Sequence, residues 1–153
     1  MDFSLTEEQQ ALQETARKYA RERLPEFAAR CEEEDEAPPQ ELVREFAGMG
    51  FLGINVAEKY GGLGLGNVEA LIVIEELAKV SGAVAFPVFE SCVGPVRAIE
   101  HFASESLRQR VIPAVCRGEK MVAVSMSEPN AGSALTDLTT RGEIRGGEVV
   151  LNG

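Results

Sequence analysis

Apolar residues recur at helical spacing along most of the chain, which predicts a scaffold of helices. The first helix is expected to begin after Thr6, whose hydroxyl can cap it, with Glu7 and Glu8 at the positive end of its dipole. We expect Pro25 to kink this helix or to divide it into two pieces. The acidic run at 32–36, followed closely by two prolines, predicts a break. The apolar face of the helix consists of Leu12, Ala16, Tyr19, Ala20, Leu24 and Phe27.

A second helix is predicted to begin at Pro39 and to end at Gly48 and Gly50. Its apolar side consists of Leu42, Val43 and Phe46. The loop that follows, residues 60–66, is rich in glycine, but it lacks the preceding strand and the spacing of a dinucleotide-binding fingerprint. We therefore expect its glycines to serve tight turns and close packing.

Three further helical segments are predicted before the pattern changes. Residues 68–80 are apolar around most of the circumference, which indicates a helix enclosed by its neighbours. Residues 86–102 form the next predicted helix, with Pro87 near its start and Pro95 bending it midway. Ser104 can cap a last short helix that runs to about residue 115.

After Lys120 the pattern becomes that of strands, because apolar and polar residues alternate over short runs bounded by turn residues. Pro129 has no backbone N–H, so the first strand should end near Ser127. The predicted strands are 121–127, 138–144 and 148–151, with a hairpin turn at 145–147.

These segments predict a mainly α protein: an N-terminal helical bundle, residues 1–118, followed by the first strands of an incomplete antiparallel β domain, residues 119–153. Asn152-Gly153 is a hairpin turn signal with no strand after it, so we expect the β domain to be truncated. Its edge would be unprotected. The chain alone is therefore expected to expose an apolar sheet face and to associate or aggregate.

Composition narrows the class of protein. The 153 residues are 44% hydrophobic, as in globular proteins, and carry a formal net charge of -10, which disfavours nucleic acid as a partner. No apolar run approaches the roughly 20 residues that span a bilayer, and the acidic N-terminus does not resemble a signal peptide. We expect a cytoplasmic protein with no membrane partner.

Few side chains suggest chemistry of their own. The only histidine, His101, is expected to be a partly buried helix residue, and there is no histidine cluster for a metal. Glu75 and Glu76 are adjacent on a helix and point about 100° apart, so salt bridges or surface positions are expected for them. Widely separated cysteines, in no Cys-x-x-Cys arrangement, are predicted to be reduced and structural: Cys31, Cys92 and Cys116.

The most informative motif is Ser-Glu-Pro-Asn-Ala-Gly-Ser at 127–133. It offers backbone N–H groups, a glycine and hydroxyls, so a phosphate or a polar ring edge could approach closely. This motif resembles the Thr-Glu-Pro-x-x-Gly-Ser signature of the acyl-CoA dehydrogenase family of flavoenzymes. Four other segments are similar to family segments in the same order, so the resemblance covers essentially the whole chain: 49–53, 60–64, 107–120 and 151–153.

The resemblance implies FAD as cofactor and α,β-dehydrogenation of an acyl-CoA thioester, within acyl-CoA metabolism. It also implies an electron-transfer flavoprotein as electron acceptor and a homo-oligomer. In the family, the segment lining the flavin corresponds to Val124, Ser125, Met126, Ser127, Gly132 and Ser133. Ser127 stands where the family usually has Thr, and Ala134 where an Asp commonly follows the Gly-Ser pair. No residue here corresponds to the family's glutamate base, which is expected in a C-terminal domain, so the chain alone is expected to be inactive.

For the substrate, the resemblance implies that residues 86–93 line the acyl-chain cavity and that Ser133 approaches the thioester. The implied pocket residues are Phe86, Phe89, Glu90 and Val93. An ordinary core role is the alternative for each of them. Two other functions stay open: a related flavoenzyme of the same fold, such as an acyl-CoA oxidase or a flavin monooxygenase, and a non-catalytic helical oligomerisation module.

Overall fold

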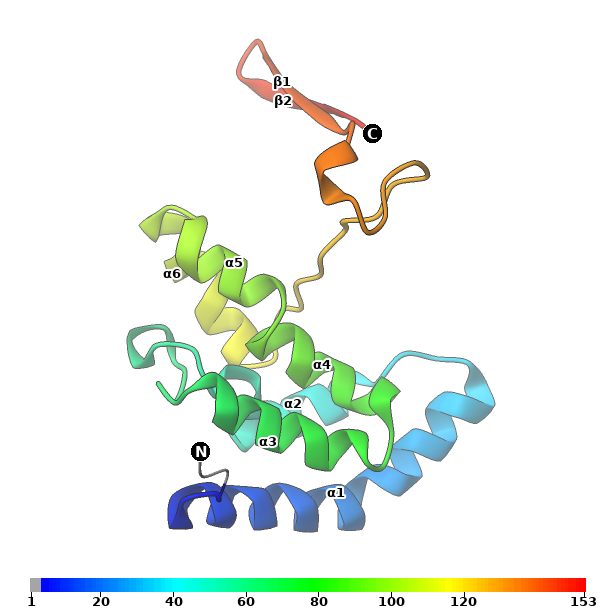
Figure 1. The fold of residues 1–153 in the computed structure, drawn as a ribbon, viewed down its shortest axis with the longest axis vertical. Coiled ribbons are helices and arrows are strands. Elements are labelled where there is room, and N and C mark those ends of the chain that lie inside the picture. Colours follow the sequence, from blue (N-terminus) through cyan, green and yellow to red (C-terminus); the bar gives the residue numbers. More distant parts are fainter. Residues whose placement is uncertain (1–3) are drawn as a thin grey trace. The chain divides into compact units, whose positions relative to one another are not determined.

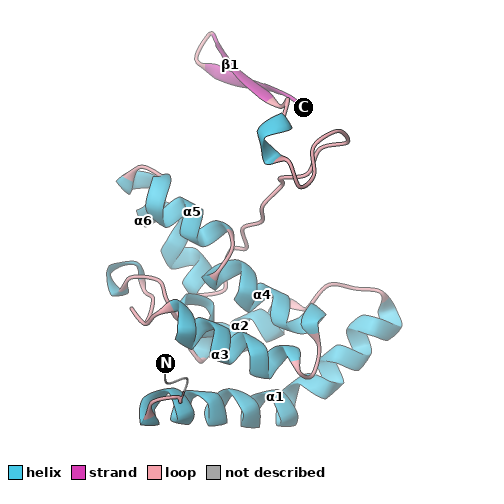
Figure 2. Ribbon diagram, viewed as in Figure 1, coloured by secondary structure: helices cyan, strands magenta, loops and turns pink. Residues whose placement is uncertain are grey.

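The computed structural model describes residues 4–153, which form two compact units (Figure 1). One unit ends at Ala123, and the other runs from Val124 to Gly153. The expected domain boundary between 118 and 119 stays a prediction. The mainly α fold class with a terminal antiparallel sheet is confirmed (Figure 2). The first unit contains helices α1 Glu7–Glu34, α2 Gln40–Gly48, α3 Asn67–Ala78, α4 Gly82–Cys92, α5 Pro95–Phe102 and α6 Glu105–Cys116.

Helix α1 begins as its sequence predicts. The Thr6 hydroxyl accepts a hydrogen bond from the Gln9 backbone N–H at 3.2 Å, and the Gln9 side chain accepts one from the Thr6 N–H at 3.0 Å, so the two residues form a capping box. Pro25 lies inside the helix and does not divide it. Figure 1 shows α1 changing direction in its second half. The helix ends at the acidic run, where Asp35 takes a left-handed φ of 51°.

The larger apolar core of the helical unit lies between α1, α2, α3 and α4, and a smaller one, which includes Tyr60 and Ile112, involves α5 and α6. Helix α3 packs against both α1 and α4, and a short 3₁₀ turn at Phe51–Gly53 packs against α2, α4 and α6. All three residues predicted for the apolar side of α2 are buried. Tyr19, Phe46 and Phe51 meet edge to face or tilted, at centroid distances of 5.9 to 6.5 Å. The largest fully buried side chains are Tyr60, Phe46, Phe51, Leu24, Leu42, Ile54, Leu77 and Ile112.

Three expectations for the helices were wrong in detail. Helix α3 is not enclosed: Val68 is 54% and Leu71 53% exposed, because α1 and α4 leave that side of α3 uncovered within the described chain. Residues 86–102 are not one bent helix, since α4 ends at Cys92 and α5 starts afresh at Pro95, whose ring suits a first helical position. His101 is exposed on α5, and its ring lies 3.1 Å from an Arg97 guanidinium nitrogen.

The glycine-rich loop has the role predicted for it. Gly61 and Gly64 have positive φ values of 91° and 67°, which glycine adopts without strain. A Cβ on Gly62 would lie 2.1 Å from the carbonyl oxygen of Val56. This glycine therefore allows two backbone segments to touch.

One stretch among residues 4–153, Gly82–Phe102, is long and apolar enough by composition to cross a membrane. In the structure this stretch is divided between α4 and α5. Val84, Val88 and Cys92 on α4 are fully buried in the helical core. Part of its apolar character is therefore used for packing within this unit, while Phe86 and Phe102 are exposed.

The second unit contains a hairpin of β1 Arg141–Arg145 and β2 Glu148–Asn152, with Ile144 paired with Val149. Gly146 and Gly147 form the predicted turn, and both have the positive φ of a tight hairpin connection. The predicted strand at 121–127 was wrong. A strand requires a partner for its backbone N–H and C=O groups, and within the described chain β1 and β2 pair only with each other.

Candidate functional site

A hollow of about 600 Å³ lies in the second unit, beside the segment that the sequence singled out. One wall consists of Ser125, Met126 and Ser127 together with Glu128 and Pro129. The rest of the lining combines polar and apolar groups from Leu138 onward. These remaining lining residues are Leu138, Thr140, Leu151 and Gly153.

The wall formed by residues 125–127 presents unused hydrogen-bonding groups. Throughout residues 4–153, no protein group forms a hydrogen bond with the backbone of these residues or with the hydroxyls of Ser125 and Ser127. They are exposed, and Met126 adds an apolar surface beside them. Such a wall can donate to the polar edge of a flat ligand and contact its apolar face.

Glu128 fixes the end of this wall. One carboxylate oxygen accepts hydrogen bonds from the backbone N–H and the hydroxyl of Thr139, both at 2.8 Å. The other oxygen accepts them from the N–H of Thr140, at 2.8 Å, and from its hydroxyl. Hydrogen bonds from Thr140 and Thr139 to the ionised form lower the pKa of Glu128 to about 2. The sequence interpretation assigned no role to Glu128, although a Thr-Thr pair follows it at 139–140.

The structure brings together only part of the predicted cofactor-binding set. Ser125, Met126 and Ser127 line the same hollow. Val124, Gly132 and Ser133 are exposed and do not line it. The assignment of all six to the cofactor stays a prediction.

The predicted substrate residues lie on α4 or at its C-terminal end, but they do not all face the same pocket. Phe86 and Phe89 have ring centroids 5.5 Å apart and are 53% and 37% exposed. They line an apolar groove of about 160 Å³ between α3 and α4, together with Ile74, Ala78, Gly82 and Ala85. Val93 is exposed and lies outside this groove.

Glu90 faces elsewhere. It lines a small cavity of about 10 Å³ with Ser91 and Lys120, among other residues. One Glu90 carboxylate oxygen is buried and has no hydrogen-bond partner among the described residues. The cavity has about the volume of one water molecule, which would satisfy that oxygen. The four predicted substrate residues therefore do not share one pocket wall here.

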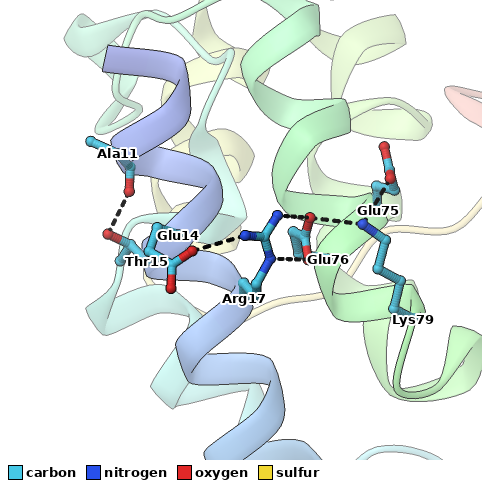
Figure 3. Close-up of polar contacts among 7 residues, drawn as sticks. All are labelled: Ala11, Glu14, Thr15, Arg17, Glu75, Glu76 and Lys79. Atoms are coloured by element: carbon cyan, nitrogen blue, oxygen red, sulfur yellow. Dashed lines mark hydrogen bonds and ion pairs between the residues drawn. The ribbon is translucent and has the colours of Figure 1, made fainter. Parts of the chain in front are cut away.

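A cluster of charges on α1 and α3 has a structural role, as predicted for Glu75 and Glu76 (Figure 3). Glu76 is buried and accepts hydrogen bonds from Arg17 at 3.2 and 3.3 Å and from Lys79 at 2.8 Å. Lys79 also lies 2.9 Å from the exposed carboxylate of Glu75. Burial raises the pKa of Glu76, but the hydrogen bonds from Arg17 and Lys79 outweigh it, and the pKa is lower than its ordinary value.

The cysteines are free and buried, as predicted. Burial raises the pKa of Cys92, and it raises the pKa of Cys116 to about 11, so both thiols stay protonated and unreactive near neutral pH. Among residues 4–153, no group of three or more His, Cys, Asp or Glu side chains is placed to hold a metal ion.

Residues 6–119 match the family model described as acyl-CoA dehydrogenase, N-terminal domain. This match covers well over half of the chain, so the chain belongs to the acyl-CoA dehydrogenase family, and the resemblance seen in the sequence is confirmed.

Comparison with individual proteins agrees. The chain is 32% identical to the glutaryl-CoA dehydrogenase of Desulfococcus multivorans over 155 residues, which cover 100% of the chain and 40% of that relative. A structure of a glutaryl-CoA dehydrogenase complexed with glutaryl-CoA superposes with a TM-score of 0.90 at 32% identity, covering 100% of the chain and 39% of that protein. An acyl-CoA dehydrogenase from Bacillus anthracis, complexed with FAD, gives 0.82 at 26% identity, with 98% and 26% covered. The chain thus spans about 40% of the length of the first relatives it matches.

Proposed function

We propose that this chain supplies part of the FAD and acyl-CoA site of an enzyme that catalyses α,β-dehydrogenation of an acyl-CoA thioester. The observation that carries the proposal is the wall of unpaired donors at Ser125, Met126 and Ser127 beside a hollow of about 600 Å³. Membership of the acyl-CoA dehydrogenase family and the FAD and glutaryl-CoA complexes of two similar proteins support it.

The residues of this wall fit the edge of a flavin. The Ser127 hydroxyl and the N–H groups of Met126 and Ser127 would donate hydrogen bonds to the polar edge of the ring and stabilise negative charge there. The Met126 side chain would contact an apolar surface. Gly132 and Ser133 would hold the pyrophosphate or the thioester. FAD bound there would be the acceptor for a hydride from the substrate β-carbon.

The predicted substrate residues would act on the acyl group. Phe86 and Phe89 offer exposed apolar surface for a hydrocarbon chain, and Val93 adds to it. Glu90 lines a separate small cavity in this chain, and it is kept in the proposal as the fourth predicted residue of the acyl site. No residue of this chain is proposed as the catalytic base. The proposal also includes an electron-transfer flavoprotein as electron acceptor, assembly as a homo-oligomer and a cytoplasmic location.

The experiment is anaerobic spectroscopy of the enzyme that carries this chain. We expect a bound flavin spectrum that bleaches when butyryl-, isovaleryl- or glutaryl-CoA is added. Absence of flavin would refute the proposal. A flavin that none of the three thioesters bleaches would refute the dehydrogenase reaction and favour a related flavoenzyme.

Variants then test the proposed wall. Ser127→Ala should raise the dissociation constant of FAD by about tenfold, because a hydrogen bond to a charged acceptor is lost. Ser106→Ala, an exposed serine on α6, is the matched control and should leave the constant unchanged. Equal affinity in both variants would remove Ser127 from the site.

A further inference from the structure

The carboxylate of Glu128 joins two segments that have no other polar link between them in the described chain. Its two oxygens accept four hydrogen bonds from the N–H and hydroxyl groups of Thr139 and Thr140. All four are charge-assisted, because Glu128 is ionised at neutral pH. One half-buried side chain thereby ties the chain at 128 to the chain just before β1.

The backbone around Glu128 is also fixed. Its N–H donates to the carbonyl of Ala131 at 2.9 Å, and the Ala131 N–H donates back to the carbonyl of Glu128 at 3.1 Å. The Ala131 side chain is buried, unlike the residues around it. Glu128 to Ala131 is therefore a closed turn, and the Glu128 side chain anchors this turn to Thr139 and Thr140.

The residues on the N-terminal side of this turn have no such support. The backbone of 125–127 makes no hydrogen bond to any other described residue. Ser127 precedes Glu128 directly, and Thr140 lines the same hollow as Ser127. The Glu128 carboxylate is thus the polar contact that ties the end of the donor wall to Thr140, another residue that lines the hollow.

We infer that Glu128 is a positioning residue for the flavin edge: by clamping Thr139 and Thr140 it holds the donors of Met126 and Ser127 in a fixed position relative to Thr140, which lines the same hollow. This inference rests on the proposed function. Glu128 itself contacts no ligand in this role, and its effect passes through Ser127. Donors fixed in advance lower the cost of ordering them when a ligand binds.

The test compares Glu128→Gln with Glu143→Gln. Both changes remove one carboxylate of the second unit, but the Glu143 side chain is exposed and pairs only with Arg145 among the described residues. In the chain without cofactor, Glu128→Gln should increase amide hydrogen exchange at Glu128 and Ala131 and at 139–140, whose N–H groups are hydrogen-bonded in the parent, because a carboxamide offers one acceptor oxygen where four donors converge. Glu143→Gln should leave both segments unchanged.

In the flavin-loaded enzyme, Glu128→Gln should raise the dissociation constant of FAD by about tenfold and shift the flavin absorption maxima and midpoint potential. Thr140→Val, which removes one hydroxyl, should give a smaller change of the same sign, and Thr140→Ser should restore the parent values. These spectroscopic readouts would not move if Glu128 served only the fold.

The outcomes separate the two claims. A parent enzyme without flavin refutes the proposed function and this inference together. A parent enzyme with flavin, but with unchanged exchange, spectrum and potential in Glu128→Gln and Thr140→Val, refutes the inference alone. If Glu128→Gln fails to fold, Thr140→Val and Thr140→Ser decide by the same measurements.

Discussion

At the scale of single residues, close backbone contact in the glycine-rich loop depends on one position. The loop folds back so that Leu63 donates its N–H to the Gly53 carbonyl at 2.8 Å, and Gly64 donates to the Val56 carbonyl at 2.9 Å. Gly62 precedes both donors and lies against the Val56 carbonyl. No side chain fits in this space without displacement of the backbone.

Gly62→Ala should therefore destabilise the helical unit by about 2–3 kcal/mol, in the range of overpacked cores. Gly48→Ala is the control: nothing lies within 4 Å of its Cβ position, and Gly48 is the last residue of α2. We expect it to be neutral or to stabilise by about 0.5 kcal/mol. Urea unfolding followed by circular dichroism measures both. Equal stabilities for the two variants would show that the loop relaxes freely.

Residue roles were predictable from sequence where the cause is local. The Thr6 cap, the packing glycines and the free cysteines all follow from residue type and neighbours. The role of Glu128 could not be predicted from the sequence, because its partners lie eleven and twelve residues away and are brought close only by the fold. The exposure of His101 was missed for the same reason, since helical spacing alone does not say which sides of a helix are covered.

At the scale of elements, the contact between α1 and α3 combines apolar packing with the buried carboxylate of Glu76. Arg17 reaches Glu76 from α1 and Lys79 reaches it from the end of α3 (Figure 3). Both cations are partly exposed, while the Glu76 side chain is almost completely buried. Removing the carboxylate leaves two cations that can still reach water.

Glu76→Ala should lower the free energy of unfolding by about 2–3 kcal/mol, less than the about 3–5 kcal/mol typical when a fully buried pair is broken. Glu75→Ala, which removes the exposed partner of Lys79, should cost at most about 0.5 kcal/mol. Chemical denaturation of the two variants at neutral pH makes the comparison. A larger effect of Glu75→Ala would contradict this account.

The contribution of Glu76 to the free energy of unfolding should also depend on pH. Its pKa in the folded chain lies below the ordinary 4.5, so its stabilisation is complete above pH 4.5 and is lost as the pH falls through the folded pKa. The stability difference between the parent chain and Glu76→Ala should therefore shrink below pH 4.5. Other carboxylates titrate in both proteins and largely cancel. A difference that stays constant down to about pH 3 would contradict the assigned pKa direction.

Element types were predictable to different degrees. Helices were predicted well because their hydrogen bonds are local and their apolar spacing is visible in the sequence. The strand expected at 121–127 was wrong although its alternation was good, because a strand depends on a partner distant in sequence. The hairpin was correct, since its two strands are joined by the Gly146-Gly147 turn.

At the scale of the whole molecule, the hairpin of the second unit has one apolar face. Ile144 and Val149 are paired across the strands, and Leu151 and Gly142 lie on the same face by the alternation of side chains. Ile144 is 83% and Val149 65% exposed. Val150 points to the opposite face. An uncovered apolar sheet face of this kind favours association.

The chain of 153 residues should therefore self-associate with increasing concentration, as its sequence already indicated. The double variant Ile144→Thr with Val149→Thr should shift the equilibrium towards monomer, while Val150→Thr should not. Sedimentation equilibrium over a range of concentrations measures the average mass. A monomeric parent chain, or equal association in all three proteins, would show that this face is not responsible.

The buried thiols give the helical unit an internal reporter. The chain has no tryptophan, and its cysteines all lie before residue 124. Because Cys92 and Cys116 are buried and protonated, a thiol reagent can modify them only when the surrounding helices open. The rate of alkylation thus measures how often the helical unit opens, and it does not depend on opening of the hairpin. Opening of the helical unit can therefore be followed separately from that of the hairpin in one unlabelled protein.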